Sequence, residues 1–97
     1  IEGSVMVAVA GMVVTRQAPG TAKGHVFLTL EDEYGLVNVV LRPQVYEKYR
    51  RIARQEPIIL VEGILQRKDG VTNVIATSLT PLKRKETPAL PEARSFR

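Results

Sequence analysis

The chain has 97 residues, no cysteine and a formal net charge of +4. This length predicts one domain, and the lack of cysteine excludes disulfides, cysteine-based zinc sites and a thiol nucleophile. The single histidine, His25, excludes a metal site built from several histidines. No apolar run reaches the roughly 18 residues of a membrane helix, and the first residues lack the pattern of a signal peptide. We therefore expect a soluble, cytoplasmic domain with no membrane partner.

The positive charge is concentrated near the C-terminus. Residues 1–82 contain nine Lys or Arg and eight Asp or Glu, whereas residues 83–97 contain five and two. The body of the chain is thus almost neutral. Its overall charge does not by itself establish a nucleic-acid-binding protein.

The first half of the chain predicts three strands. Residues 4–16 carry valines at alternate positions, with Gly11 inside the run, where an interior glycine is typical of a bulge or sharp bend. A loop over 17–24 leads to a strand over 25–31, in which Val26, Leu28 and Leu30 face the core and Phe27 faces outward. After a turn over 32–35, residues 36–42 form the third strand.

The second half predicts a helix and a hairpin. Pro43 opens the helix, where its missing N–H costs nothing, and the helix ends before Pro57. Residues 58–67 and 71–79 form two strands joined at Asp69-Gly70, a dipeptide that favours a tight type I′ turn. From residue 81 onward, charge and proline replace periodicity.

The element order indicates the fold. Five strands with a helix between the third and the fourth are typical of an OB-fold, a five-stranded Greek-key barrel. We therefore expect an all-β domain with one helix over residues 4–80, followed by an extended, basic, proline-containing tail over 81–97. The isolated domain is expected to be a monomer.

No catalytic constellation is present in the sequence. The Glu31-Asp32-Glu33 cluster lies in a turn, which favours solvated carboxylates over a metal site. The Gly20–Gly24 segment lacks the spacing of a nucleoside-triphosphate loop. We therefore predict no catalytic residue, no metal ligand and no cofactor in this chain.

The polar face of the second and third strands is the better candidate site. In an OB-fold this face and its neighbouring loops bind single-stranded nucleic acid. An exposed Phe27 would stack on a base, although the same ring could instead pack in a small second core. The predicted nucleic-acid-binding residues are Phe27, Asn38, Arg42, Lys23, Arg16, His25, Thr29, Arg67 and Lys68.

Three stretches together resemble a known family. They are residues 9–24, which include Arg-Gln-Ala-Pro-Gly-Thr-Ala-Lys-Gly, residues 26–35 and Val61-Glu62-Gly63. They are similar to the C-terminal OB domain of bacterial C-family DNA polymerase alpha subunits, and most similar to the error-prone, ImuC-type branch. The last five residues, 93–97, also resemble the end of that branch. The Phe-x-x-Leu-Glu-Asp-x-x-Gly segment occurs in anticodon-binding OB domains as well, although Asn38 stands where those domains carry Gln.

The resemblance implies a function for the longer protein. It would be a DNA-directed DNA polymerase for mutagenic translesion synthesis and DNA repair, with its catalytic carboxylates far upstream, so this fragment alone is not an enzyme. The fragment would hold single-stranded template DNA. Two alternatives are docking of a Y-family-like partner protein through the tail at Phe96, and anticodon-type tRNA binding.

Overall fold

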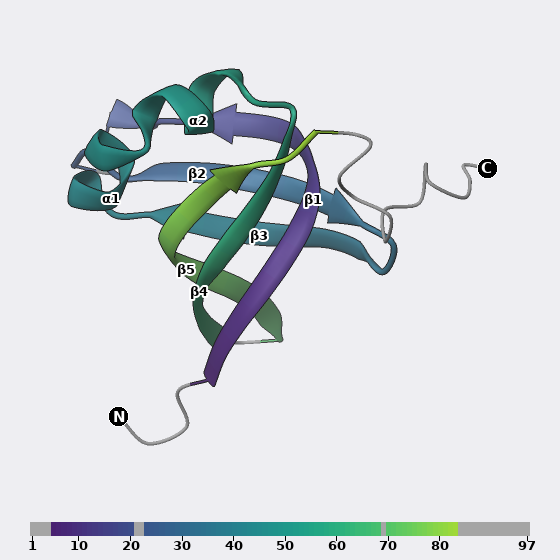
Figure 1. The fold of residues 1–97 in the computed structure, drawn as a ribbon. Helices are drawn as coiled ribbons and strands as arrows, with labels where there is room; N and C mark the ends of the chain where they lie inside the picture. Colours follow the sequence, from purple (N-terminus) through teal and green to yellow (C-terminus); the bar gives the residue numbers. More distant parts are fainter. Residues whose placement is uncertain (1–4, 21–22, 69, 84–97) are drawn as a thin grey trace.

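The chain forms a closed five-stranded barrel (Figure 1). The computed structural model describes residues 5–20, 23–68 and 70–83, with only the backbone of Lys68. The strands are β1 (Val5–Gln17), β2 (Val26–Asp32), β3 (Gly35–Leu41), β4 (Ile58–Lys68) and β5 (Val71–Pro81). Around the barrel they follow the order β1-β2-β3-β5-β4. Only the β3–β5 pair is parallel, and the other four pairs are antiparallel. The predicted OB-fold is confirmed.

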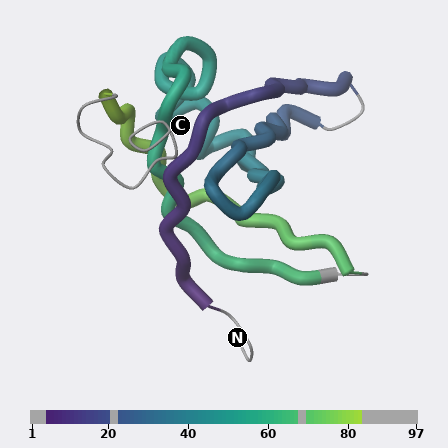
Figure 2. Tube along the Cα trace, turned by 90° about the vertical axis from the view of Figure 1, so that its right-hand side faces the viewer, coloured from purple at the N-terminus to yellow at the C-terminus, as the bar shows by residue number. Residues whose placement is uncertain are grey.

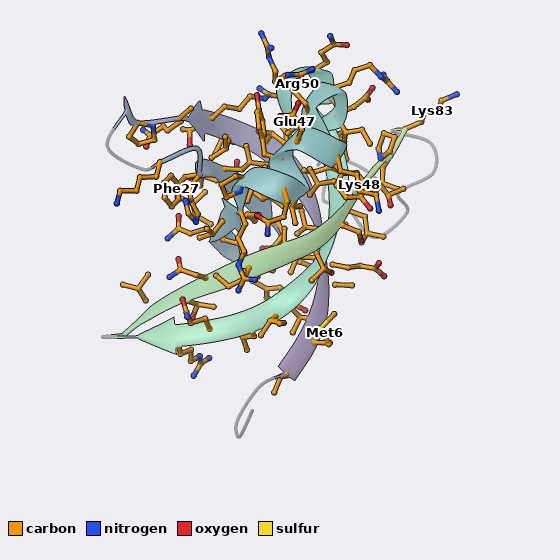
Figure 3. The ribbon with its side chains drawn as sticks, turned by 90° about the vertical axis from the view of Figure 1, so that its left-hand side faces the viewer. Met6, Phe27, Glu47, Lys48, Arg50 and Lys83 are labelled. Atoms are coloured by element: carbon orange, nitrogen blue, oxygen red, sulfur yellow. The ribbon has the colours of Figure 1, made fainter. Side chains whose placement is uncertain are left out.

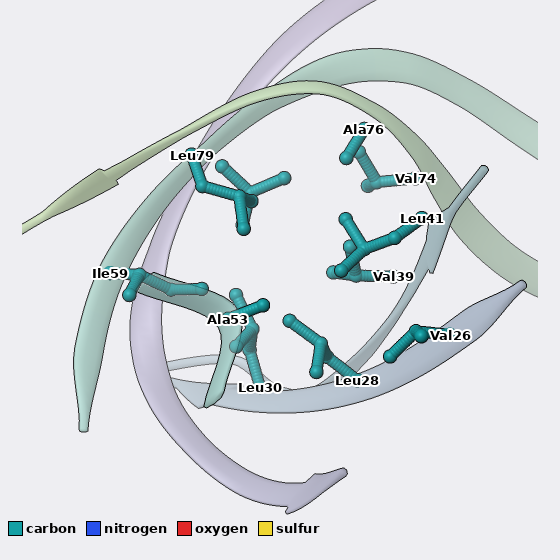
Figure 4. Packing of buried hydrophobic residues seen from close by; sticks show 11 residues of the cluster. Val26, Leu28, Leu30, Val39, Leu41, Ala53, Ile59, Val74, Ala76 and Leu79 are labelled. Carbon is teal, nitrogen blue, oxygen red and sulfur yellow. The ribbon is translucent and has the colours of Figure 1, made fainter. Parts of the chain in front are cut away.

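The interior is filled by aliphatic side chains at alternate strand positions (Figure 4). Leu28 and Leu30 on β2 are 1% and 0% exposed, and Val39 and Leu41 on β3 are both 0% exposed. Strand side chains point alternately to opposite faces, so the residues between these positions face outward. The predicted inward face of β2 is therefore confirmed, and Phe27 lies on the outer side.

Strand β1 exchanges one partner strand for the other near its middle. Val5–Met12 pair with β4, and Met12–Gln17 pair with β2. Gly11 is buried at this corner, where an added Cβ would lie 2.8 Å from the Glu31 carbonyl oxygen. The sequence predicted a bend or bulge at Gly11. The close approach is indeed at Gly11, but the shift in register lies between Val13 and Thr15.

The predicted single helix is two short helices, α1 (Pro43–Lys48) and α2 (Arg50–Gln55). The break is at Tyr49, whose φ of −113° and ψ of 24° lie outside the helical region. Hydrogen bonds still run from Tyr49 N–H to Val45 O and from Ala53 N–H to Tyr49 O. The change of direction lets both helices cover one end of the curved barrel, with Ala53 1% exposed against the core (Figure 1).

The last strand is longer than predicted. β5 continues to Pro81, and the Leu82 N–H donates a 2.9 Å hydrogen bond to Ile58 O. Because the start of β4 offers this acceptor, pairing extends beyond residue 79, where the sequence predicted the end of this strand. Residues 84–97, which include the predicted docking residue Phe96, lie outside the described residues. In the part that is described, no helix is long and apolar enough to cross a membrane.

Candidate nucleic-acid interface

The outer face of β2 and β3 brings three of the predicted residues together. Thr29 pairs with Asn38, and Phe27 pairs with Val40. Asn38 is exposed, whereas Phe27, Thr29 and Val40 are half-buried. Directly opposed residues on neighbouring strands have Cβ atoms about 5 Å apart. The face therefore presents an uncharged polar pair next to an aromatic–aliphatic pair.

Phe27 stands on the side of the barrel toward which the β4–β5 hairpin projects (Figure 3). Strands β4 and β5 run side by side to the tip of that hairpin (Figure 2). The hairpin pairs as far as Lys68 and Val71, and Arg67 near its tip is exposed. The side chain of Lys68 is outside the description. Phe27 on β2 and Arg67 on β4 thus come from different elements, and their contact with nucleic acid stays a prediction.

The β1–β2 connection supplies the opposite edge of the site. Lys23 is exposed and has a φ of 56°, a left-handed conformation that is uncommon for residues other than glycine. His25 lies just before β2 instead of inside it, and Arg42 follows β3 as the exposed N-cap of α1. A cavity of about 430 Å³ lies between this connection and α1, lined by Ala18, Pro19, Gly20, Gly24, His25, Val26, Pro43, Tyr46 and Glu47. The cavity contains little charge, which makes it unsuited to a phosphate group.

Arg16 has structural contacts that the sequence did not predict. Its Nε donates a 2.7 Å hydrogen bond to Ala53 O, and its Nη2 donates a 2.9 Å hydrogen bond to Glu56 O. These carbonyl groups lie at the end of α2, where helices leave acceptors without partners inside the helix. The guanidinium group therefore ties β1 to the helix cap. Two of its donor atoms, Nε and Nη2, are therefore engaged within the chain itself.

Charge changes sign along β2. The cationic end has Lys23 before the strand, and the opposite end carries Glu31, Asp32 and Glu33. The Tyr34 N–H donates a 2.7 Å hydrogen bond to Asp32 Oδ1 in the turn. A hydrogen bond to Glu33, together with its negative charge, raises the pKa of Tyr34 above its usual value of 10.0. A polyanion is repelled by this acidic end, so phosphates fit better near Lys23 and Arg42.

Three of the basic residues on the helices contact neighbouring helix residues or Glu56. Arg50 Nη1 lies 3.5 Å from Glu47 Oε2, Arg51 Nη1 lies 3.9 Å from Glu56 Oε2, and Lys48 Nζ lies 5.5 Å from the Tyr49 ring centroid. Exposed pairs of this kind are worth about 0–1 kcal/mol. In the described residues, no three His, Asp or Glu side chains form a group that could hold a metal ion.

Strand pairing places two further polar residues beside the predicted face, and neither was among the predicted site residues. Asn73 on β5 pairs with Asn38, and Gln66 on β4 pairs with Asn73. Both lie beside the predicted face. Both are polar residues inside strands that the sequence predicted, but their position next to Asn38 depends on the barrel order.

Several relatives and solved structures are similar to this chain. A family model described as "OB-fold nucleic acid binding domain" matches residues 7–82. An error-prone DNA polymerase of Ruegeria pomeroyi is 50% identical over 76 residues, which cover 78% of this chain and 7% of that protein. An error-prone DNA polymerase of Rhodopirellula baltica is 42% identical over 97 residues, covering all of this chain and 8% of that protein. The chain thus spans less than a tenth of the length of these curated relatives.

Two solved structures share the fold. The S. pombe Stn1–Ten1 complex aligns over 82% of this chain and 60% of its own, with a TM-score of 0.69 and 20% identity. Asparaginyl-tRNA synthetase from Pyrococcus horikoshii aligns over 95% of this chain and 24% of its own, with a TM-score of 0.64 and 25% identity. With the barrel order and a family match over residues 7–82, the chain belongs to the OB-fold nucleic acid binding domain family.

Proposed function

We propose that this chain binds single-stranded DNA on the outer face of β2 and β3. The observation that carries the proposal is the in-register placement of Phe27–Val40 beside Thr29–Asn38. A ring and a branched aliphatic side chain offer a surface for the face of a base, and the polar pair offers hydrogen bonds to its edge. Lys23 and Arg42 at the cationic end provide charges for the phosphates.

The similarity of this chain to parts of DNA polymerases supports DNA as the ligand. The similar relatives are error-prone DNA polymerases, and this chain corresponds to a small part of each. We infer that the domain holds the single-stranded template of such a polymerase during translesion synthesis and DNA repair. In this proposal the chain binds and does not catalyse. Tethering to the polymerase raises the local concentration of the domain, so weak intrinsic affinity is sufficient.

The test is a titration of a fluorescein-labelled single-stranded oligonucleotide, followed by anisotropy at low salt. Phe27→Leu keeps an apolar side chain of similar size and removes the stacking surface. We expect it to weaken binding about tenfold, equivalent to about 1.4 kcal/mol, within the range for one stacked base. The matched control is Tyr34→Leu, since Tyr34 is an aromatic residue that is 89% exposed in the acidic turn. It should change affinity less than about twofold.

Two results would overturn the proposal. One is the absence of binding by the wild-type chain at low salt. The other is equal affinity of Phe27→Leu and wild type, when circular dichroism shows that both proteins are folded. The salt dependence adds an independent check, because removal of one phosphate contact by Arg42→Gln should reduce the slope of log K against log salt by about one.

RNA binding of the anticodon type is the second candidate. The observation that favours it is the likeness to asparaginyl-tRNA synthetase over 95% of this chain. The same titration with an RNA oligonucleotide of identical sequence separates the two. Tighter binding of RNA by about tenfold or more would assign the face to RNA, because a protein can recognise the 2′-hydroxyl that DNA lacks.

A further inference from the structure

One outward polar residue from each of the five strands belongs to a continuous row. Thr15 pairs with Thr29, Thr29 with Asn38, Asn38 with Asn73, and Asn73 with Gln66. Strands lie about 4.8 Å apart, so the row extends about 19 Å along the curved sheet. We call Asn38, Asn73 and Gln66 the amide row. It continues from the proposed DNA-binding face over β5 and β4.

The side chains of the amide row have no polar partner within the described part of the chain. None of its three side chains forms a hydrogen bond there, whereas Arg16, Thr77 and Ser78 do. Asn38 and Gln66 are exposed, and Asn73 is half-buried. Each amide offers both a donor and an acceptor. The row therefore presents unused hydrogen-bonding groups at adjacent positions of three strands.

A second row beside the polar row is apolar. Phe27 pairs with Val40, Val40 with Ile75, and Ile75 with Ile64. All four are half-buried. The two rows are two residues apart along each strand, a separation of about 6.6 Å. A base whose face rests on the apolar row directs one edge toward the amides.

The amide row itself carries no charge that would attract a phosphate. Its members are uncharged, and Glu31 follows Thr29 by two positions on the same face of β2. A phosphate there would lie near a carboxylate without a cation among the row residues to balance it. Base edges, in contrast, carry the neutral donors and acceptors that amides match. Asn and Gln pair in a bidentate manner with adenine above all, through N6–H and N7.

We infer that the amide row reads base edges and gives the domain a preference for adenine in the bound strand. This inference rests on the proposed function, since it requires a single strand on the β2–β3 face. It goes further by assigning sequence preference to Asn73 and Gln66, on strands outside that face. The interface thus extends over β5 and β4 instead of ending at β3.

The test compares oligonucleotides of about 12 nucleotides, a length within the site sizes of OB-folds. Binding of oligo-dA and oligo-dT is measured by anisotropy for wild type, Asn73→Ala and Gln66→Ala. The stacking of each oligonucleotide on itself is the same for every variant, so it cancels when the dA/dT affinity ratios are compared. The matched control is Thr80→Ala, an exposed polar residue of β5 that is paired with Leu60, away from the row.

We expect Asn73→Ala to lower the dA/dT affinity ratio at least about fivefold, the lower end for loss of one bidentate amide–base pair. Gln66→Ala should lower it in the same direction, and Thr80→Ala should leave it unchanged. If all variants bind and the ratio is that of wild type, the inference is overturned while the proposed function stands. If wild type binds neither oligonucleotide, the proposed function itself fails.

Discussion

Substitution of Gly63 by alanine tests the packing of the barrel most sharply. Gly63 is buried on β4 opposite Ala76, beside a register shift between Glu62 and Gly63. A Cβ added there would meet the Ile75 carbonyl oxygen directly, and it would lie 2.8 Å from Ile75 C and 2.9 Å from Ala76 Cα. All three atoms belong to the backbone, so no side-chain rotation relieves the contact. β4 and β5 must move apart.

The size of the effect follows from two opposing contributions. Overpacking of a filled interior costs about 1–3 kcal/mol, and a contact with fixed backbone belongs at the upper end. Replacing glycine also reduces the entropy of the unfolded chain, which returns about 0.4–1 kcal/mol. The net loss in free energy of unfolding is therefore about 2–2.5 kcal/mol. For a domain of this size that lowers Tm by about 10–20 °C.

Urea unfolding followed by far-ultraviolet circular dichroism measures this loss. The control is Gly20→Ala, because a Cβ at Gly20 meets nothing within 4 Å. It should change stability by less than about 0.5 kcal/mol, as surface substitutions usually do. A Gly63→Ala variant within about 0.5 kcal/mol of wild type, with an unchanged m value, would refute the close approach of β4 and β5 described here.

Two further predictions concern single side chains. Arg16→Met removes both hydrogen bonds to the end of α2, and we expect a loss of about 1–2 kcal/mol by urea unfolding with less than a twofold change in DNA affinity. A large loss of affinity at unchanged stability would instead make Arg16 a DNA contact. The raised pKa of Tyr34 means that its phenol ionises at higher pH than a free tyrosine. Glu33→Ala removes the main cause of this raised pKa. The absorbance change on ionisation of Tyr34, obtained by difference from Tyr34→Phe, should therefore occur at lower pH. An unchanged transition would contradict the assigned cause.

Local sequence pattern predicted the strands well because strand alternation is a local property. Val26, Leu28 and Leu30 share one face for steric reasons that hold in any strand, and the barrel buries all three. The same alternation placed Phe27 and Thr29 outward. The helical segment was less predictable. Its apolar spacing indicated one helix, but the curved end of the barrel accommodates two, separated at Tyr49.

Arg16 shows why the candidate site was only partly predictable. An arginine at a strand end next to a glycine-containing loop has the pattern of a nucleic-acid contact. Its acceptors, Ala53 O and Glu56 O, lie 37 and 40 residues further along the chain. No periodicity links such distant positions. The contact exists because closure of the barrel brings the end of α2 over β1.

The sequence by itself determined the alternation of each strand, the order of the elements and, through them, the OB-fold. These properties depend on neighbours within a few residues and on short connections, which the sequence displays directly. Only the tertiary structure decided which outward residues stand side by side. Asn38, Asn73 and Gln66 became neighbours through the parallel β3–β5 pair and the β4–β5 register, since a shift of one residue would have turned each of them to the other face.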